Sequence, residues 1–176
     1  MKLYHGTNSL FDEFDNRYLC TNDSIDQYGS GFYFYDSPAP TVKYGNLCVI
    51  VNTEDLKTIE YDSQIELDED TVFRMIVESP EFEFRLEDHG DIEYEGFNNV
   101  LNQTVKRYKG NFLDQLNAIG NDFYSPENTY ILLRKFKKLT GINCITDKKY
   151  RIYVMMDNRD IEILKVITLE EMEEEI

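Results

Sequence analysis

The pattern of apolar and polar positions divides the chain into two strand-like ends and a helix-like middle. Near the start, residues 2–4 predict a short strand, and residues 5–8 predict the turn that ends it. Residues 31–35 alternate, which predicts a strand with Phe32 and Phe34 on one face and Tyr33 and Tyr35 on the other. The apolar run at 47–51 is rich in β-branched residues and predicts a buried strand.

The middle of the chain carries helical spacing. Acidic residues at 68–70 precede a helical pattern of apolar positions, and further helices are predicted near 100–108 and from 112 to a stop at Gly120. The clearest helix is predicted over residues 126–140. It has an N-cap at Ser125, proline at its first position and Gly141 after its end. Residues 80–96 are acidic and irregular, and predict an exposed excursion.

Strand patterns return over residues 143–146, 150–156 and 161–167. Thr168 and Glu171 then have the spacing of a capping box at the start of a terminal acidic helix. Strands, then helices, then strands predict an α+β fold rather than a doubly wound α/β fold. We therefore expect a single domain over residues 1–176, with a helical insertion at roughly 66–140.

The charge balance narrows the class of partner. The 176 residues include 34 acidic and 18 basic side chains, a formal net charge of −16. Such an excess repels polyanions, so we expect no nucleic acid and no membrane as partners, and a basic protein is favoured.

Three cysteines, at positions 20, 48 and 144, lack metal-ligand spacing and predict a reducing compartment. The start of the chain has no apolar signal region, and no apolar run approaches the length of a membrane span. We therefore expect a cytoplasmic protein.

Two segments carry candidate chemistry. In the first, His5 is followed by Gly6 and Thr7; a glycine lets a ligand approach the backbone closely, although a lone histidine after a strand is more often structural. In the second, residues 28–45, two tyrosine rings from Tyr33 and Tyr44 can sandwich a flat heterocycle, and a cationic ring gains cation–π attraction. The alternative is that these aromatics are all core.

The prolines of the second segment, Pro38 and Pro40, predict a turn into a short helix that ends near Tyr44 and Gly45. Within that helix, the Thr41 hydroxyl can bind a carboxamide.

Taken in order, these elements resemble a known family. HGT at 5–7, GSGFYF at 29–34, and Thr41 with Tyr44 resemble the NAD-binding core of the H-Y-E class of ADP-ribosyltransferases, which includes the poly(ADP-ribose) polymerases and diphtheria toxin. The short form is similar to bacterial and phage members. Further matches are TGINC at 140–144 and the closing strand and its continuation, IYVMMDNRDIEILKV, at 152–166.

The resemblance implies a split β-sheet fold that uses NAD+ as co-substrate, without a metal. It implies that His5 binds a ribose hydroxyl, that the Gly6 backbone holds the nicotinamide carboxamide, and that Tyr33 and Tyr44 stack on the ring. The remaining residues carried over as NAD-binding are Thr7, Gly31 and Thr41.

At one position the chain departs from the family. Ile152 stands where the catalytic glutamate is expected, which argues against chain elongation. An isoleucine at this position is still compatible with single transfer if a substrate carboxylate supplies the missing negative charge. It is also compatible with NAD binding without catalysis. A shifted register of this strand, or a carboxylate from elsewhere such as Asp147 or Glu87, is a further alternative.

Three functions remain open on the sequence. The leading one is mono-ADP-ribosyl transfer to a protein, as by a bacterial toxin or effector or a phage factor. The second is a catalytically weak or inactive binding module that docks a basic protein. The third is NAD hydrolysis without an acceptor.

Overall fold

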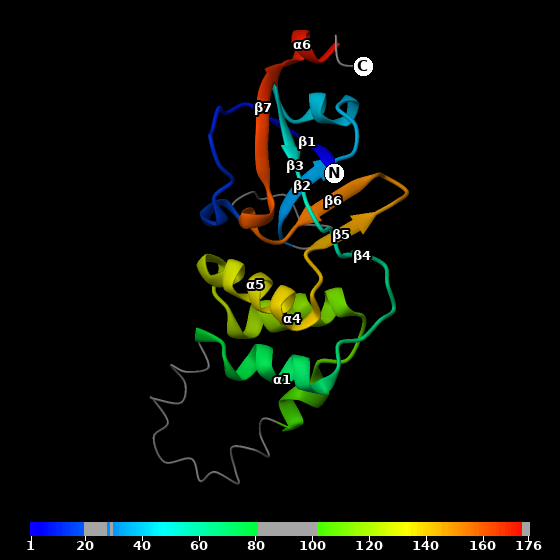
Figure 1. Cartoon of the computed structure of the whole chain (residues 1–176). Helices are drawn as coiled ribbons and strands as arrows, with labels where there is room; N and C mark the ends of the chain where they lie inside the picture. The colour runs from blue at the N-terminus through cyan, green and yellow to red at the C-terminus, as the bar shows by residue number, and fades with distance from the viewer. Residues whose placement is uncertain (20–27, 29, 81–101, 174–176) are drawn as a thin grey trace. The chain divides into compact units, whose positions relative to one another are not determined.

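The computed structural model describes residues 1–19, 28, 30–80 and 102–173 (Figure 1). The chain divides into two compact units. The first combines Met1–Tyr61 with Ile142–Ile176, and the second is Asp62–Gly141. The second unit corresponds closely to the helical insertion that the sequence predicts at roughly 66–140.

The first unit contains a seven-stranded sheet in the order β4-β5-β6-β2-β1-β3-β7. Neighbouring strands are antiparallel except β4 and β5, which are parallel. The strands are β1 (Lys2–Thr7), β2 (Phe32–Tyr35), β3 (Leu47–Asn52), β4 (Thr58–Glu60), β5 (Cys144–Asp147), β6 (Ile152–Met155) and β7 (Glu162–Thr168).

The continuous apolar run of β3 lies between two neighbours, which explains why it lacks alternation. Its four central residues are fully buried, and β1 and β7 pair along its two edges. On one face of these strands Cys48 and Ile50 pack with Ile167 and Met172, covered by Tyr4 and Leu169. Burial on both faces selects β-branched and other apolar side chains at every position.

The backbone pairing between β1 and β2 covers fewer residues than the pairing of β1 with β3 or of β2 with β6. These strands pair at Tyr4 and Tyr35, whereas β1 and β3 pair over the whole of β1 and β2 and β6 over the whole of β2. Beyond the Tyr4–Tyr35 pair, the link from β1 to β2 is made by the His5 side chain, whose Nδ1 lies 2.8 Å from the Tyr33 carbonyl oxygen. The two halves of the sheet are therefore joined by little backbone pairing at this point.

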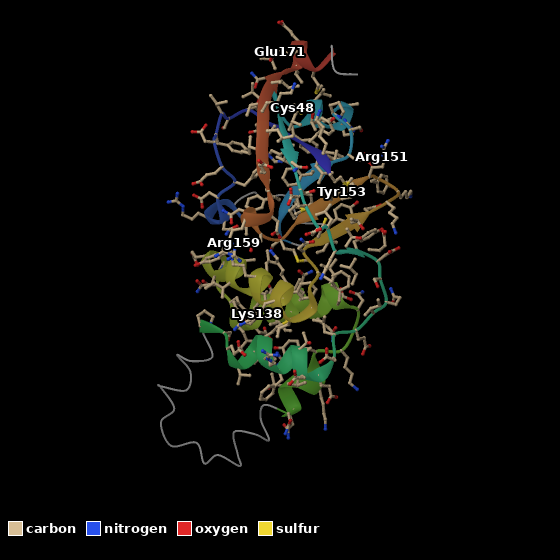
Figure 2. The ribbon with its side chains drawn as sticks, in the orientation of Figure 1. Cys48, Lys138, Arg151, Tyr153, Arg159 and Glu171 are labelled. Atoms are coloured by element: carbon tan, nitrogen blue, oxygen red, sulfur yellow. The ribbon has the colours of Figure 1, made fainter. Side chains whose placement is uncertain are left out.

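Among the described residues of the first unit there are also four short helices: η1 (Asn16–Tyr18), η2 (Ala39–Lys43), η4 (Asn158–Asp160) and α6 (Leu169–Glu173). The predicted capping box of α6 is confirmed. The Thr168 amide donates to Glu171 Oε2 at 2.8 Å, and the Glu171 amide donates to Thr168 Oγ1 at 3.3 Å. Glu171 is labelled at this helix in Figure 2.

The second unit is helical, with α1 (Glu69–Val77), α4 (Phe112–Phe123), η3 (Pro126–Asn128) and α5 (Thr129–Thr140). Residues 102–107 are also helical. Its core includes Phe112 and Phe136, whose stacked rings have centroids 6.2 Å apart. The Tyr124 hydroxyl joins α4 to α1 by donating to the Met75 carbonyl at 2.6 Å.

The fold is α+β, as the sequence predicts, but several boundaries differ. The turn predicted at 5–8 is wrong, because β3 pairs with β1 as far as Thr7. The stop predicted at Gly120 is also wrong: α4 continues to Phe123, since Phe123 extends the buried stripe of Leu116 and Ile119.

Other segments also depart from the predicted elements. The helix predicted over 126–140 begins as a 3-10 turn and becomes α-helical at Thr129, and Gly141 ends it at φ 76° as predicted. The sequence missed β4. The start predicted for β6 is replaced by a turn over residues 148–151.

Cys48 and Cys144 are both buried. Cys20, Glu87, His89 and nearly all of the predicted excursion at 80–96 lie outside the described residues. Within the described residues, the helices are too short or too polar to cross a membrane.

Candidate functional site

His5 is enclosed by aromatic rings. Its centroid lies 5.3 Å from that of Phe14, 5.6 Å from Phe34 and 6.3 Å from Phe11. This burial lowers the pKa of His5 below its ordinary value, although the bond to the Tyr33 carbonyl opposes the change. Because a carbonyl oxygen can only accept, Nδ1 carries the proton, and the neutral ring presents Nε2 as an acceptor.

The side chains of β2 divide between two faces of the sheet. Phe32 and Phe34 are buried against Phe14 on the face where the His5 ring lies. Because side chains alternate along a strand, Tyr33 and Tyr35 lie on the opposite face. The structure therefore brings His5 to the Tyr33 backbone and places the two side chains on opposite faces.

Gly6, Thr41 and Tyr44 meet at one point, although 35 residues separate the first two. A Cβ at position 6 would lie 2.2 Å from the Thr41 carbonyl oxygen and 3.0 Å from the Tyr44 Cβ. The Tyr44 amide donates to the same Thr41 carbonyl at 2.9 Å. Only a residue without a side chain lets η2 sit this close to β1.

A second glycine, Gly45, lies just after η2, where the sequence predicts the helix to end; its close approach to β1 was not predicted. A Cβ at Gly45 would lie 2.0 Å from the Thr7 carbonyl oxygen. Together, Gly6 and Gly45 bind the segment that carries Tyr44 to the end of β1. The sequence feature that could have indicated this contact is the position of Gly45 directly after Tyr44, a tyrosine predicted to bind a ligand ring.

The ring stacked against Tyr44 is that of Tyr35. The centroids are 6.0 Å apart, the planes differ by 24°, and the two hydroxyl oxygens are 2.8 Å apart. Burial raises the pKa of Tyr35, and the hydrogen bond to Tyr44 adds to the rise. Tyr44 is 54% exposed, so this pair lies at the surface of the first unit.

Tyr33 lies in a different group of rings. Its centroid is 6.4 Å from that of Tyr28, which packs edge-on against Tyr61 at 4.9 Å. Burial raises the pKa of Tyr28 to about 12, and the neighbouring Asp147 carboxylate adds to the rise. Tyr33 and Tyr44, expected to stack on the same ligand ring, thus have different aromatic neighbours.

Ile152 begins β6 directly beside Tyr35. It is opposed by Tyr35 on β2 and by Asp147 on β5. Cross-strand partners point to the same face, so Ile152 shares a face with Tyr35 and Asp147. The position where the family resemblance expects a carboxylate is therefore apolar and adjacent to the Tyr35–Tyr44 pair.

Asp147 is a buried carboxylate with incomplete hydrogen bonding. It is 2% exposed, and Oδ1 accepts from the Tyr150 amide at 3.0 Å. Within the described residues, Oδ2 accepts no hydrogen bond of good geometry, although the Tyr28 hydroxyl lies close enough for the carboxylate to raise its pKa. Burying an acceptor in this way costs about 1–3 kcal/mol, and such exceptions call for a structural or functional explanation.

Asp157, by contrast, is a buried carboxylate that is paired with the exposed side chain of a cation, Arg159. Its Oδ2 lies 2.5 Å from Arg159 Nη2, and its side chain caps η4.

An ion pair lies at the end of β2 and the start of β6. Arg151 Nε is 2.7 Å from Asp36 Oδ1, and these residues directly follow Tyr35 and precede Ile152. Arg151 has φ 57°, a conformation rare for a residue with a side chain. Figure 2 shows Arg151 at the turn between β5 and β6, with Tyr153 along β6.

The remaining predicted site residues have structural contacts of their own. The Thr41 hydroxyl donates to the Pro38 carbonyl at 2.6 Å, and Thr7 Oγ1 accepts from the Ser9 amide at 3.1 Å. A Cβ at Gly31 would lie 2.4 Å from Val154 Cγ1, so packing against β6 accounts for this glycine. In the part of the chain that the structure describes, no three His, Cys, Asp or Glu side chains form a group that could hold a metal ion.

Comparisons with known proteins give little further guidance. No family model matches the sequence, and no curated protein matches it. A solved structure described as the crystal structure of an anti-CRISPR protein is similar at 12% identity, over 93% of this chain and 95% of that chain. Its TM-score of 0.36 is too low to support an inference about fold or function.

Proposed function

We propose that the chain binds NAD and transfers a single ADP-ribosyl group to a protein. The observation that carries the proposal is the meeting of Gly6, Thr41 and Tyr44, three residues that the resemblance to ADP-ribosyltransferases assigns to one nicotinamide site. Their convergence requires β1 and η2 to pack closely, and nothing in the residue spacing alone ensures it.

Two further features support an NAD site. The brief pairing of β1 with β2 is compatible with the split sheet that the resemblance implies. The exposed ring of Tyr44 offers a surface for a nicotinamide ring.

The reaction is a substitution at the ribose C1′. The bond from C1′ to the nicotinamide nitrogen breaks, its electron pair leaves with nicotinamide, and positive charge develops on the ribose. A nucleophilic oxygen or nitrogen of the acceptor then bonds to C1′ and loses any proton it carries to solvent. Ile152 supplies no negative charge, so a carboxylate of the acceptor protein would stabilise the cation.

A binding module that retains NAD without reaction is the second candidate. The apolar side chain of Ile152 beside Tyr35 favours it, because this strand position then contributes binding surface without charge. The net charge of −16 fits a basic protein partner under either proposal.

Incubation with adenine-labelled NAD and a cell lysate distinguishes these functions. Label on a protein supports transfer, and free ADP-ribose alone supports hydrolysis. Thermal stabilisation by NAD without either product supports the binding module. The absence of both products and of stabilisation would overturn all three.

Variants test the site itself. We expect Tyr44→Ala to abolish the NAD-dependent signal, while Tyr150→Ala, at a tyrosine that is also 54% exposed, preserves it. His5→Ala is expected to lose it as well. Ile152→Glu should increase NAD hydrolysis, and an unchanged rate would contradict the assignment of this strand position.

A further inference from the structure

The Tyr35–Tyr44 pair combines parallel rings with surface exposure. Within the described residues, the other stacked pair is Phe112 with Phe136, and both of those side chains are fully buried. Core packing explains the phenylalanine pair. It does not explain a tyrosine pair in which one ring is 54% exposed.

The backbone holds this pair in place before any ligand arrives. Tyr35 is paired on both sides, with Tyr4 of β1 and Ile152 of β6. Tyr44 follows η2, which Gly6 and Gly45 hold against β1. A site whose supporting backbone is already ordered loses little conformational entropy when it binds.

Tyr33 lacks this relation to Tyr44. It lies two residues away on the same face, opposite the fully buried Val154, with Tyr28 as its ring neighbour. Alternation gives Tyr33 and Tyr35 the same face, and the path of η2 brings Tyr44 to Tyr35.

We infer that Tyr35, rather than Tyr33, is the partner of Tyr44 in a clamp for a flat cationic ring of the pyridinium class. This inference rests on the proposed function and changes one of its ring-binding residues. The electron-rich faces of two tyrosines attract a cationic ring on both sides. The net charge of −16 adds a favourable field.

Ring insertion requires the pair to open. A ring held between two others needs about 7 Å between them, twice the contact distance of carbon atoms. The centroids are 6.0 Å apart, so the rings must separate and the hydroxyl–hydroxyl bond must break. Removal of the Tyr35 hydroxyl should therefore preserve or improve binding, whereas removal of the ring should abolish it.

The test is a titration with N-methylnicotinamide methylated at the ring nitrogen, which makes it a pyridinium cation, with neutral nicotinamide as the matched probe. The chain has 13 tyrosines and no tryptophan, so tyrosine fluorescence can follow binding without a tryptophan signal. Tyr35→Ala and Tyr44→Ala should each weaken binding of the cation at least tenfold. Tyr35→Phe should bind as tightly as the wild type or more tightly, and Tyr33→Ala should stay within threefold.

Folding is checked by circular dichroism on each variant, and Tyr35→Phe keeps the inference testable if Tyr35→Ala does not fold. Tenfold weaker binding by Tyr35→Phe, or equal binding of both probes, would overturn the inference. A wild type that binds NAD and depends on Tyr33 but not Tyr35 overturns this inference alone. A wild type that binds neither NAD nor N-methylnicotinamide overturns the proposed function as well.

Discussion

The two faces of β2 are built from similar rings and behave differently. On one face Phe32 and Phe34 pack against Phe14 and His5 in a buried aromatic cluster. On the other, Tyr35 stacks with the exposed Tyr44 and the two share a hydroxyl–hydroxyl bond. A hydroxyl on each ring is the chemical difference, and it lets the tyrosine face meet water and ligands while the phenylalanine face stabilises the fold.

The strongest test of this comparison is Phe34→Ala against Tyr35→Ala. Phe34 is fully buried, so its truncation should lower the free energy of unfolding by about 3–5 kcal/mol. Tyr35→Ala should cost less than half as much, because its partner is exposed. Urea denaturation measures both. Equal losses would show that the tyrosine face is also core.

Gly6→Ala tests whether the close approach of η2 to β1 is needed to place Tyr44 against Tyr35. The new methyl group would lie 2.2 Å from the Thr41 carbonyl, so we expect destabilisation of about 1–3 kcal/mol with displacement of Tyr44. Gly120→Ala is the control within α4, where the nearest atom is Leu132 Cδ2 at 3.2 Å. A gain in helix propensity of up to about 1 kcal/mol there offsets this contact. Thermal denaturation that shows equal effects would contradict the role of Gly6.

His5, on the same face of β2 as Phe32 and Phe34, makes the folding stability depend on pH. Burial lowers its pKa in the folded state, so the unfolded chain binds the proton more readily. Its contribution to stability is full above the ordinary pKa of 6.5 and is lost as the pH falls through the lowered folded pKa. The slope reaches at most about 1.4 kcal/mol per pH unit. His5→Asn should remove this part of the dependence between pH 7.5 and 5.5, measured by urea denaturation.

Tyr35→Phe should have the smallest effect on stability. It removes the hydroxyl–hydroxyl bond at the surface and keeps the ring, so we expect a loss of about 0.5 kcal/mol. The raised pKa of Tyr35 reaches its ordinary value only when the bond to Tyr44 and the burial are both lost. Absorbance titration of Tyr44→Phe should therefore show part of this shift removed. An unchanged titration would contradict the hydroxyl pair.

Much of the fold could be predicted because local signals agree with tertiary packing. The alternation at residues 31–35, the buried run at 47–51 and the Thr168–Glu171 capping box all lie where expected. Strand β4 was missed because three residues carry too little periodicity, and its pairing with β5 supplies the missing stabilisation.

The contacts among the candidate site residues could be predicted only in part. Gly6, Thr41 and Tyr44 lie in contact, and their role in a nucleotide site stays a prediction. The ring partner of Tyr44 differs from the one expected, and Asp147 lies beside Ile152 with an oxygen that accepts no hydrogen bond of good geometry among the described residues. Both depend on the pairing of distant strands, which residue spacing does not encode.

The sequence by itself determined which face of β2 each aromatic ring occupies, because side chains alternate along any strand. It also determined the acidic surface charge and the helical character of the middle. Only the tertiary structure decided that Tyr35 meets Tyr44 and that His5 bonds to the Tyr33 backbone. The physical reason is close packing, because the approach of η2 to β1 depends on both Gly6 and Gly45. The brief pairing of β1 with β2 also leaves the Tyr33 carbonyl beyond the residues where these two strands pair, and the His5 side chain forms a hydrogen bond with it.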